Sequence, residues 1–196
     1  MSEPLGRFIG NALEVQECLD ILHGKTAVDH GKDYSDTIEL TLILAGHMLT
    51  LGGKSRSPIE GYKIAQELLQ NGSALKKFEE LVKAQGGSIP KSLPKAPLRH
   101  EVLANQNGVM RFRNLEKLGL AAITLGAGRK SQADKIDFAA GIEVLVTDAQ
   151  PVHAGQPLLR LYAQNDLLIQ SALELVEASY GVVTATATPP PLIAKI

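Results

Sequence analysis

The stretch Gly86–Pro97, with the sequence GGSIPKSLPKAP, divides the chain into two parts of different character. It contains two glycines and three prolines among small and basic residues. Proline lacks the backbone N–H that helices and central strands need, and glycine is the residue most costly to order, so this composition is typical of a linker. We therefore predict a linker at residues 88–97, between one domain at 1–87 and a second at 98–196.

Upstream of the linker the apolar residues follow helical spacing. Ser57-Pro58 places a favoured cap residue before a proline at the first helical position. Residues 36–51 are apolar nearly all round, which predicts a buried helix that ends at Gly52-Gly53. His47 lies in this helix, where we expect a hydrogen-bonded core residue. The predicted helices of this half span residues 11–22, 36–51, 58–70 and 74–85.

Downstream of the linker strands and helices are mixed, so the whole chain is predicted to be of the α+β class. Asn107-Gly108 is a turn signal between residues 98–104 and 109–113, which predicts that these two segments pair as strands. A second turn is expected at residues 153–156. The other predicted elements are strands at 141–146 and 157–162, helices at 115–125 and 166–179, and an edge strand or loose segment at 183–188.

The composition excludes several classes of protein. Hydrophobic residues make up 44% and charged residues 21%, as in ordinary globular domains. The formal charge of -1 provides no electrostatic reason to expect nucleic acid or an anionic membrane as partner. Cys18 is the only cysteine, so an intrachain disulfide is impossible, and we expect it to pack inertly in the first helix. No apolar stretch is long enough to span a bilayer, and the expected location is the cytoplasm.

Few side chains suggest a site by their spacing. Residues 126–129 (GAGR) can form an anion cradle of backbone N–H groups and a guanidinium, but a turn after a helix explains them more simply. The five histidines lack the spacing of metal ligands. The residues by themselves therefore indicate no catalytic group.

Three groups of short motifs follow one another along the chain. They are EPLG at 3–6 with GNALEV at 10–15; NGSAL at 71–75 with Phe78 and AQGG at 84–87; and GLAA at 119–122 with LGAGR at 125–129, DKID at 134–137 and Gly141. In this order they resemble the thymidine phosphorylase and pyrimidine-nucleoside phosphorylase family. They cover almost the whole chain, and the likeness is to the C-terminal portion of those enzymes. This resemblance implies that residues 1–87 are the C-terminal helical part of an α/β domain and that 98–196 are an α+β domain with a barrel-sandwich-hybrid core.

The resemblance implies a pentosyltransferase of pyrimidine nucleoside salvage. Such an enzyme sends phosphate to C1′ of the sugar, giving free pyrimidine and pentose 1-phosphate, and must hold phosphate and stabilise charge on the departing base. The family's phosphate-binding and pyrimidine-binding motifs are not found here and are expected in an N-terminal part. No catalytic residue is therefore predicted in this chain, and activity of the chain alone stays open. Family members are homodimers, so the expected partner is a second copy or the N-terminal half.

One site of the family matches in part. The resemblance implies that Leu5 and Phe8 offer backbone oxygens and Glu17 a carboxylate to a K+ or Ca2+ ion, with no organic cofactor. Hard cations of this kind prefer several oxygen ligands. The alternative is that Glu17 is a solvated helix residue.

Two other functions are open. Residues 141–162 resemble one hairpin of biotinyl and lipoyl carrier domains, although no lysine lies between Lys135 and Lys195 to carry the modification. The chain can also be a non-catalytic interaction module, such as one half of a split enzyme. That function predicts an exposed apolar surface on the first-half helices.

Overall fold

The computed structural model describes residues 3–26, 31–184, 188 and 191–193. Helices and antiparallel sheets are both present, so the predicted α+β class is confirmed. The chain forms two compact units. The first contains Met1–Glu17, Asp29–Lys32 and Leu93–Pro191, and the second contains Cys18–Val28, Asp33–Ser92 and Leu192–Ile196. The predicted boundary at 88–97 and the barrel-sandwich-hybrid core stay predictions.

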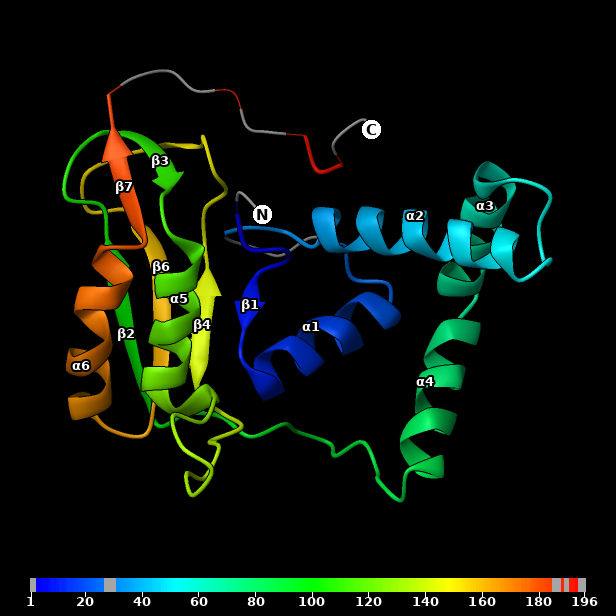
Figure 1. Cartoon of the computed structure of the whole chain (residues 1–196), viewed down its shortest axis with the longest axis horizontal. Helices are drawn as coiled ribbons and strands as arrows, with labels where there is room; N and C mark the ends of the chain where they lie inside the picture. Colours follow the sequence, from blue (N-terminus) through cyan, green and yellow to red (C-terminus); the bar gives the residue numbers. More distant parts are fainter. Residues whose placement is uncertain (1–2, 27–30, 185–187, 189–190, 194–196) are drawn as a thin grey trace. The chain divides into compact units, whose positions relative to one another are not determined.

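Two antiparallel sheets build the first unit (Figure 1). One has the strand order β1-β4-β6-β2 and the other β5-β3-β7. The strands are β1 (Phe8–Ile9), β2 (Leu98–Leu103), β3 (Gly108–Phe112), β4 (Gly141–Val144), β5 (Pro151–Val152), β6 (Pro157–Ala163) and β7 (Tyr180–Val183). The predicted pairing of β2 with β3 is wrong, because the turn at Asn107 leads from one sheet into the other.

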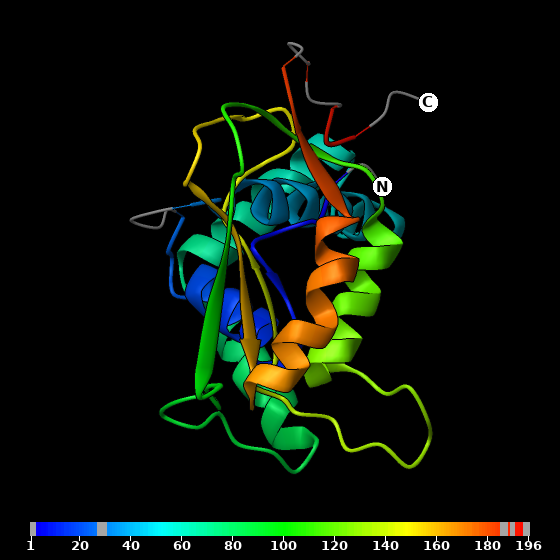
Figure 2. The same ribbon diagram turned by 90° about the vertical axis from the view of Figure 1, so that its left-hand side faces the viewer.

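Helices α5 (Leu115–Ala122) and α6 (Asp166–Glu177) pack against each other beside the first sheet (Figure 2). Each begins at an asparagine cap, since Asn114 and Asn165 accept backbone N–H groups of their own first turns. The apolar faces of both helices meet the inner face of the sheet. The fully buried core includes Met110, Leu118, Leu125, Ile142, Val144, Leu158, Leu159, Leu161 and Val176.

Helices form the second unit: the end of α1 (Asn11–Leu22), then α2 (Ser35–Leu51), α3 (Pro58–Gln70) and α4 (Ser73–Ala84). Ser57 caps α3 by accepting the N–H of Glu60 at 3.2 Å, as its sequence predicts. α2 and α3 cross at two glycines. A Cβ added at Gly61 would lie 2.4 Å from the carbonyl oxygen of Gly46, so only glycine permits this approach.

The predicted burial of α2 is wrong, although its predicted length is nearly right. Only Leu42 and Gly46 of this helix are buried, while 71% of Met48 and 89% of Leu51 are exposed. Apolar composition all round a helix predicts burial only if neighbours cover every side, and α3 covers one. His47 is likewise exposed and not a core residue.

Two smaller expectations concern single segments. Cys18, expected to pack inertly, is exposed. Of the predicted edge strand at 183–188, residue 183 ends β7, and residues 185–187 lie outside the described residues. No helix among the described residues has the length and apolar character that crossing a bilayer requires.

Candidate functional site

A row of charged side chains crosses the outer face of the first sheet. Strand alternation directs Ile142, Val144 and Leu161 to the core, so Glu143 and Arg160 project from the opposite face. The register places Glu143 on β4 opposite Arg160 on β6, and Arg160 opposite Glu101 on β2. We call these three residues, with Arg7 and Tyr162, the charged ladder.

Hydrogen bonds join every member of the charged ladder. Arg160 donates through Nη1 to Glu143 Oε2 at 2.7 Å and through Nη2 to Glu101 Oε1 at 2.9 Å. The hydroxyl of Tyr162 donates to Glu143 Oε2 at 2.7 Å, and Arg7 Nε donates to Glu143 Oε1 at 2.7 Å. Glu143 is 3% exposed and so lies at the buried centre, where a carboxylate is tolerated only with such partners.

Proton affinities follow from these contacts. Burial raises the pKa of Glu143, but hydrogen bonds from Tyr162 and Arg7 and the charges of Arg7 and Arg160 outweigh it and hold that pKa below its ordinary value. Burial, together with the hydrogen bond to Glu143 and its charge, raises the pKa of Tyr162 to about 12. At neutral pH the ladder therefore holds an ionised Glu143 and a neutral Tyr162. Neither group is poised to exchange a proton near pH 7.

The predicted cation ligands lie in and beside the turn that leads into β1. Glu17 is 5% exposed, and its Oε2 accepts the backbone N–H of Arg7 at 3.0 Å and of Phe8 at 3.2 Å. The structure thus brings Glu17 to Phe8, and it excludes the alternative of a solvated helix residue. Leu5 precedes this turn and is exposed. The backbone atoms that contact the Glu17 carboxylate are N–H donors, so a cation held by Glu17 and the backbone oxygens of Leu5 and Phe8 stays a prediction.

The same segment of chain is tied to the charged ladder. Arg7 supplies the N–H that Glu17 accepts and the guanidinium that Glu143 accepts. Its Nη1 donates to the carbonyl of Lys32 at 3.0 Å, and Lys32 Nζ donates to the carbonyl of Pro4 at 2.6 Å. The ladder therefore anchors the N-terminal segment to the sheet. A substitution at Glu143 should alter the position of Arg7 and, with it, the turn that Glu17 contacts.

The GAGR segment at 126–129 forms a turn. Residues Ile123–Ala127 make one π-helical turn after α5, and Gly126 has φ 113°, which favours glycine. The carbonyl of Gly126 accepts the N–H of Asp137 at 2.9 Å, and the carbonyl of Ala127 accepts the side-chain amide of Asn11 at 2.8 Å. The backbone conformation and these contacts support the turn over the anion cradle.

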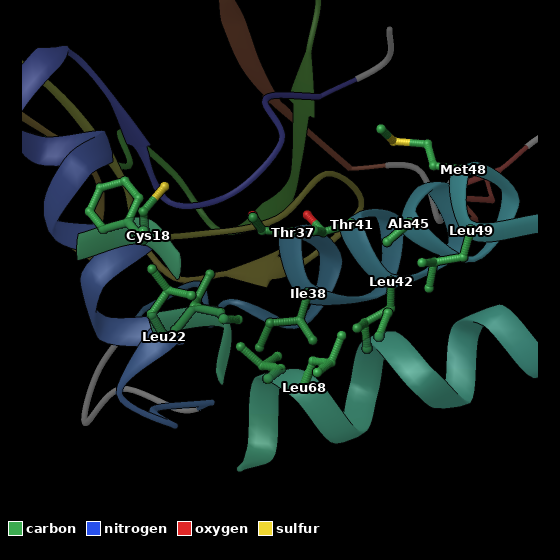
Figure 3. Close-up of a pocket in the computed structure, with 15 residues that line it drawn as sticks. Cys18, Leu22, Thr37, Ile38, Thr41, Leu42, Ala45, Met48, Leu49 and Leu68 are labelled. Carbon is green, nitrogen blue, oxygen red and sulfur yellow. The ribbon is translucent and has the colours of Figure 1, made fainter. Parts of the chain in front are cut away.

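The two units each carry one cavity of interest. The second unit has an apolar groove of about 500 Å³ between α1, α2, α3 and α4, into which Leu22, Ile38, Leu42 and Leu68 project (Figure 3). The first unit has a polar cleft of about 550 Å³ lined from β2, β7 and α6. In the part of the chain that the structure describes, no three His, Cys, Asp or Glu side chains gather as a metal cluster.

Comparison with known proteins identifies the relatives of this chain. Residues 109–183 match the family described as the pyrimidine nucleoside phosphorylase C-terminal domain. A pyrimidine-nucleoside phosphorylase of Staphylococcus haemolyticus is 35% identical over 201 residues, which cover 100% of this chain and 44% of the relative. The chain matches the C-terminal portion of the pyrimidine-nucleoside phosphorylase family. This confirms the resemblance inferred from the motifs.

Other relatives of this family agree. A pyrimidine-nucleoside phosphorylase of Bacillus subtilis is 38% identical over 171 residues, 85% of this chain and 38% of that protein. A thymidine phosphorylase of Mycobacterium tuberculosis is 41% identical over 162 residues, 83% of this chain and 35% of its own length. The chain thus spans less than half the length of the phosphorylases that it matches.

The charged ladder was missed from the sequence, although a signal exists. Glu143 is the one charge in the apolar segment GIEVLV at 141–146, and Arg160 is the one charge in PLLRLY at 157–162. Two lone opposite charges in neighbouring apolar strands indicate a buried ion pair. Arg7 carries no such signal, because its partner Glu143 lies 136 residues away.

Proposed function

We propose that this chain is the C-terminal portion of a pyrimidine-nucleoside phosphorylase. The intact enzyme takes a pyrimidine nucleoside and phosphate and gives the free base and a pentose 1-phosphate, in the cytoplasm. The observation that carries this proposal is the 35% identity to the Staphylococcus haemolyticus enzyme over the whole chain. The family match at residues 109–183 also supports this proposal, and it does not depend on the sequence before residue 109.

Within this enzyme the chain acts as a scaffold. The groups that hold nucleoside and phosphate belong to the part of the enzyme that the relatives contain and this chain does not match. The charged ladder supports this division. Its titratable groups are ion-paired or hydrogen-bonded to one another, and the central carboxylate is buried, so their chemistry is structural. We assign the barrel-sandwich-hybrid core to residues 98–196, as the family resemblance implies.

The chain associates through an exposed apolar face of α2, which adjoins the groove at Met48. Leu44, Met48 and Leu51 follow i, i+4, i+7 spacing on α2, and all three are exposed. A contiguous apolar surface of this kind marks an interaction site. The partner that we assign to this surface is the part of the enzyme that this chain does not match, since the chain spans only 44% of the Staphylococcus haemolyticus protein. A homodimer is the competing outcome.

The turn at Glu17 takes part in binding a K+ or Ca2+ ion, with backbone oxygens of Leu5 and Phe8. The ion would neutralise the Glu17 carboxylate and stiffen the segment before α1. Thermal denaturation of the chain in KCl, CaCl2 and choline chloride at equal ionic strength tests this role. A rise in midpoint specific to K+ or Ca2+, absent in Glu17→Gln, supports the ion. Equal midpoints in all three salts count against it.

Phosphorolysis assays test the main proposal. Release of thymine from thymidine and of uracil from uridine is measured for the chain alone and for the chain mixed with the unmatched part of the Bacillus subtilis relative. We expect no turnover by the chain alone and turnover by the mixture. Turnover by the chain alone would place the catalytic groups here and refute the scaffold role. Binding without turnover by the mixture would favour the non-catalytic interaction module.

The carrier-domain alternative receives no support from the structure. The turn at Gly155 joins strands of different sheets and carries no lysine, and none lies between Lys135 and Lys195. An intact mass that exceeds the sequence mass by a biotinyl or lipoyl group would restore this alternative.

A further inference from the structure

Both sheets of the first unit end on an open strand edge, and the two edges line one cleft. β2 is the last strand of the four-stranded sheet, and β7 is the last strand of the three-stranded sheet. Within the described residues β2 pairs only with β6, and β7 pairs only with β3. Residues 100–103 of β2 and 180–182 of β7 line the polar cleft of about 550 Å³.

The hydrogen-bond pattern shows which backbone groups of β2 face the cleft. The N–H of Leu145 donates to the carbonyl of Leu158 at 3.0 Å. Backbone bonding directions alternate along a strand, so Leu158, Arg160 and Tyr162 of β6 bond toward β4, and the residues between and after them bond toward β2. The residues of β6 that bond toward β2 are paired with Leu98, His100 and Val102. The N–H and C=O groups of Arg99 and Glu101 therefore point away from β6, to the open edge.

The same alternation orients β7. The N–H of Arg113 donates to the carbonyl of Ser179 at 2.8 Å, so the backbone groups of Tyr180 and Val182 point away from β3. A side-chain contact supports this orientation, because Gln106 Nε2 donates to the carbonyl of Val182 at 2.8 Å from the open side. The cleft is thus bordered by the backbone groups of Glu101 on one side and by those of Tyr180 and the N–H of Val182 on the other, since Gln106 occupies the Val182 carbonyl.

The side chains of the cleft add charge and apolar walls. Val102, Leu173, Glu177 and Tyr180 line it, and burial together with the charge of Glu177 raises the pKa of Tyr180. Arg113 also lines the cleft and makes no ion pair with any described residue. Its guanidinium lies directly on the backbone of β7, since a Cβ added at Gly181 would fall 2.3 Å from Arg113 Cζ.

We propose that this cleft binds an extended polypeptide segment, which adds as a strand to the edges of β2 and β7 and places an acidic side chain on Arg113. Backbone groups on two edges provide affinity that is independent of sequence. The exposed, unpaired guanidinium provides charge complementarity for one carboxylate, which it can bind through two parallel N–H donors. The volume lies within the range of clefts that enclose ligands. This proposal does not depend on the phosphorylase assignment.

A peptide titration followed by two-dimensional ¹⁵N NMR of the full chain tests the proposal. The probe is an eight-residue peptide of alternating threonine and valine, with one central aspartate and a lysine at each end. We expect shift changes concentrated at the amides of Arg99, Glu101, Tyr180 and Val182. The same peptide with N-methyl groups on alternate amides should bind at least about tenfold more weakly, because it loses several strand hydrogen bonds.

Two variants test the carboxylate contact separately. Arg113→Gln should weaken the aspartate peptide about two- to fivefold and leave its asparagine counterpart unchanged, as expected for one exposed ion pair. Gly181→Ala should do the same without touching Arg113 itself, since the added methyl displaces the flexible end of that side chain. Arg129→Gln, an exposed arginine outside the cleft, is the matched control. Shift changes elsewhere, no binding, or equal binding of the N-methylated peptide would overturn the proposal.

Discussion

Replacing Glu143 with glutamine tests the charged ladder most directly. The variant keeps the size of the side chain but removes a charge that is 3% exposed and accepts hydrogen bonds from Arg7, Arg160 and Tyr162. Removing one partner of a buried ion pair leaves the other charge uncompensated, at a cost of about 3–5 kcal/mol. Arg160 keeps Glu101 as a partner, so we expect the lower end, about 3 kcal/mol.

Urea denaturation followed by circular dichroism measures this loss of unfolding free energy. Thermal denaturation should show a midpoint lower by roughly 6–12 °C, from about 2–4 °C per kcal/mol for a chain of this size. Glu174→Gln is the matched control, since Glu174 is exposed on α6 and should change stability by no more than about 0.5 kcal/mol. A loss below about 1 kcal/mol for Glu143→Gln would refute the reasoning, because the ladder would then hold no desolvated charge.

Four further changes test the ladder tyrosine, a helix cap and two glycine positions. Tyr162→Phe should cost about 1 kcal/mol of unfolding free energy. Because the folded-state pKa of about 12 lies above the ordinary 10.0, the stabilisation by the tyrosine is complete below pH 10 and is lost as the pH rises through 12. Unfolding curves at pH 8 and 11.5 should therefore show a smaller stability difference between wild type and variant at the higher pH. Asn165→Ala should cost about 1 kcal/mol in urea unfolding, because it removes the cap of α6, and a loss near zero would show that the cap is not used. Gly61→Ala should destabilise the second unit by about 1–3 kcal/mol, since its methyl meets a backbone carbonyl of α2. Gly119→Ala, where nothing lies within 4 Å, should instead stabilise α5 by about 0.5–1 kcal/mol, and equal effects of the two changes in thermal melts would contradict the packing argument.

The sequence by itself determined the local structure, because local structure depends on neighbours a few residues apart. Ser57-Pro58 begins α3 where a cap and a first-turn proline predict it, and Gly52 ends α2. Periodic apolar residues predicted α6, and apolar strands predicted β4 and β6, within two residues of their observed ends. Short ordered motifs also sufficed to recognise the family.

Tertiary structure alone decided which surfaces are covered and which charges meet. α2 has the composition of a buried helix, yet Leu51 is 89% exposed because burial depends on neighbours that no local pattern specifies. Strands β2 and β3 adjoin a turn signal, but they join different sheets because pairing depends on which edges are free. Arg7 meets Glu143 across 136 residues, and Glu17 meets the turn before β1, only after the chain has folded. Contacts between distant residues follow from the whole packed structure. For that reason the cleft and the pairing of Arg7 with Glu143 gave no signal in the sequence, and the rest of the ladder gave only two lone charges in apolar strands.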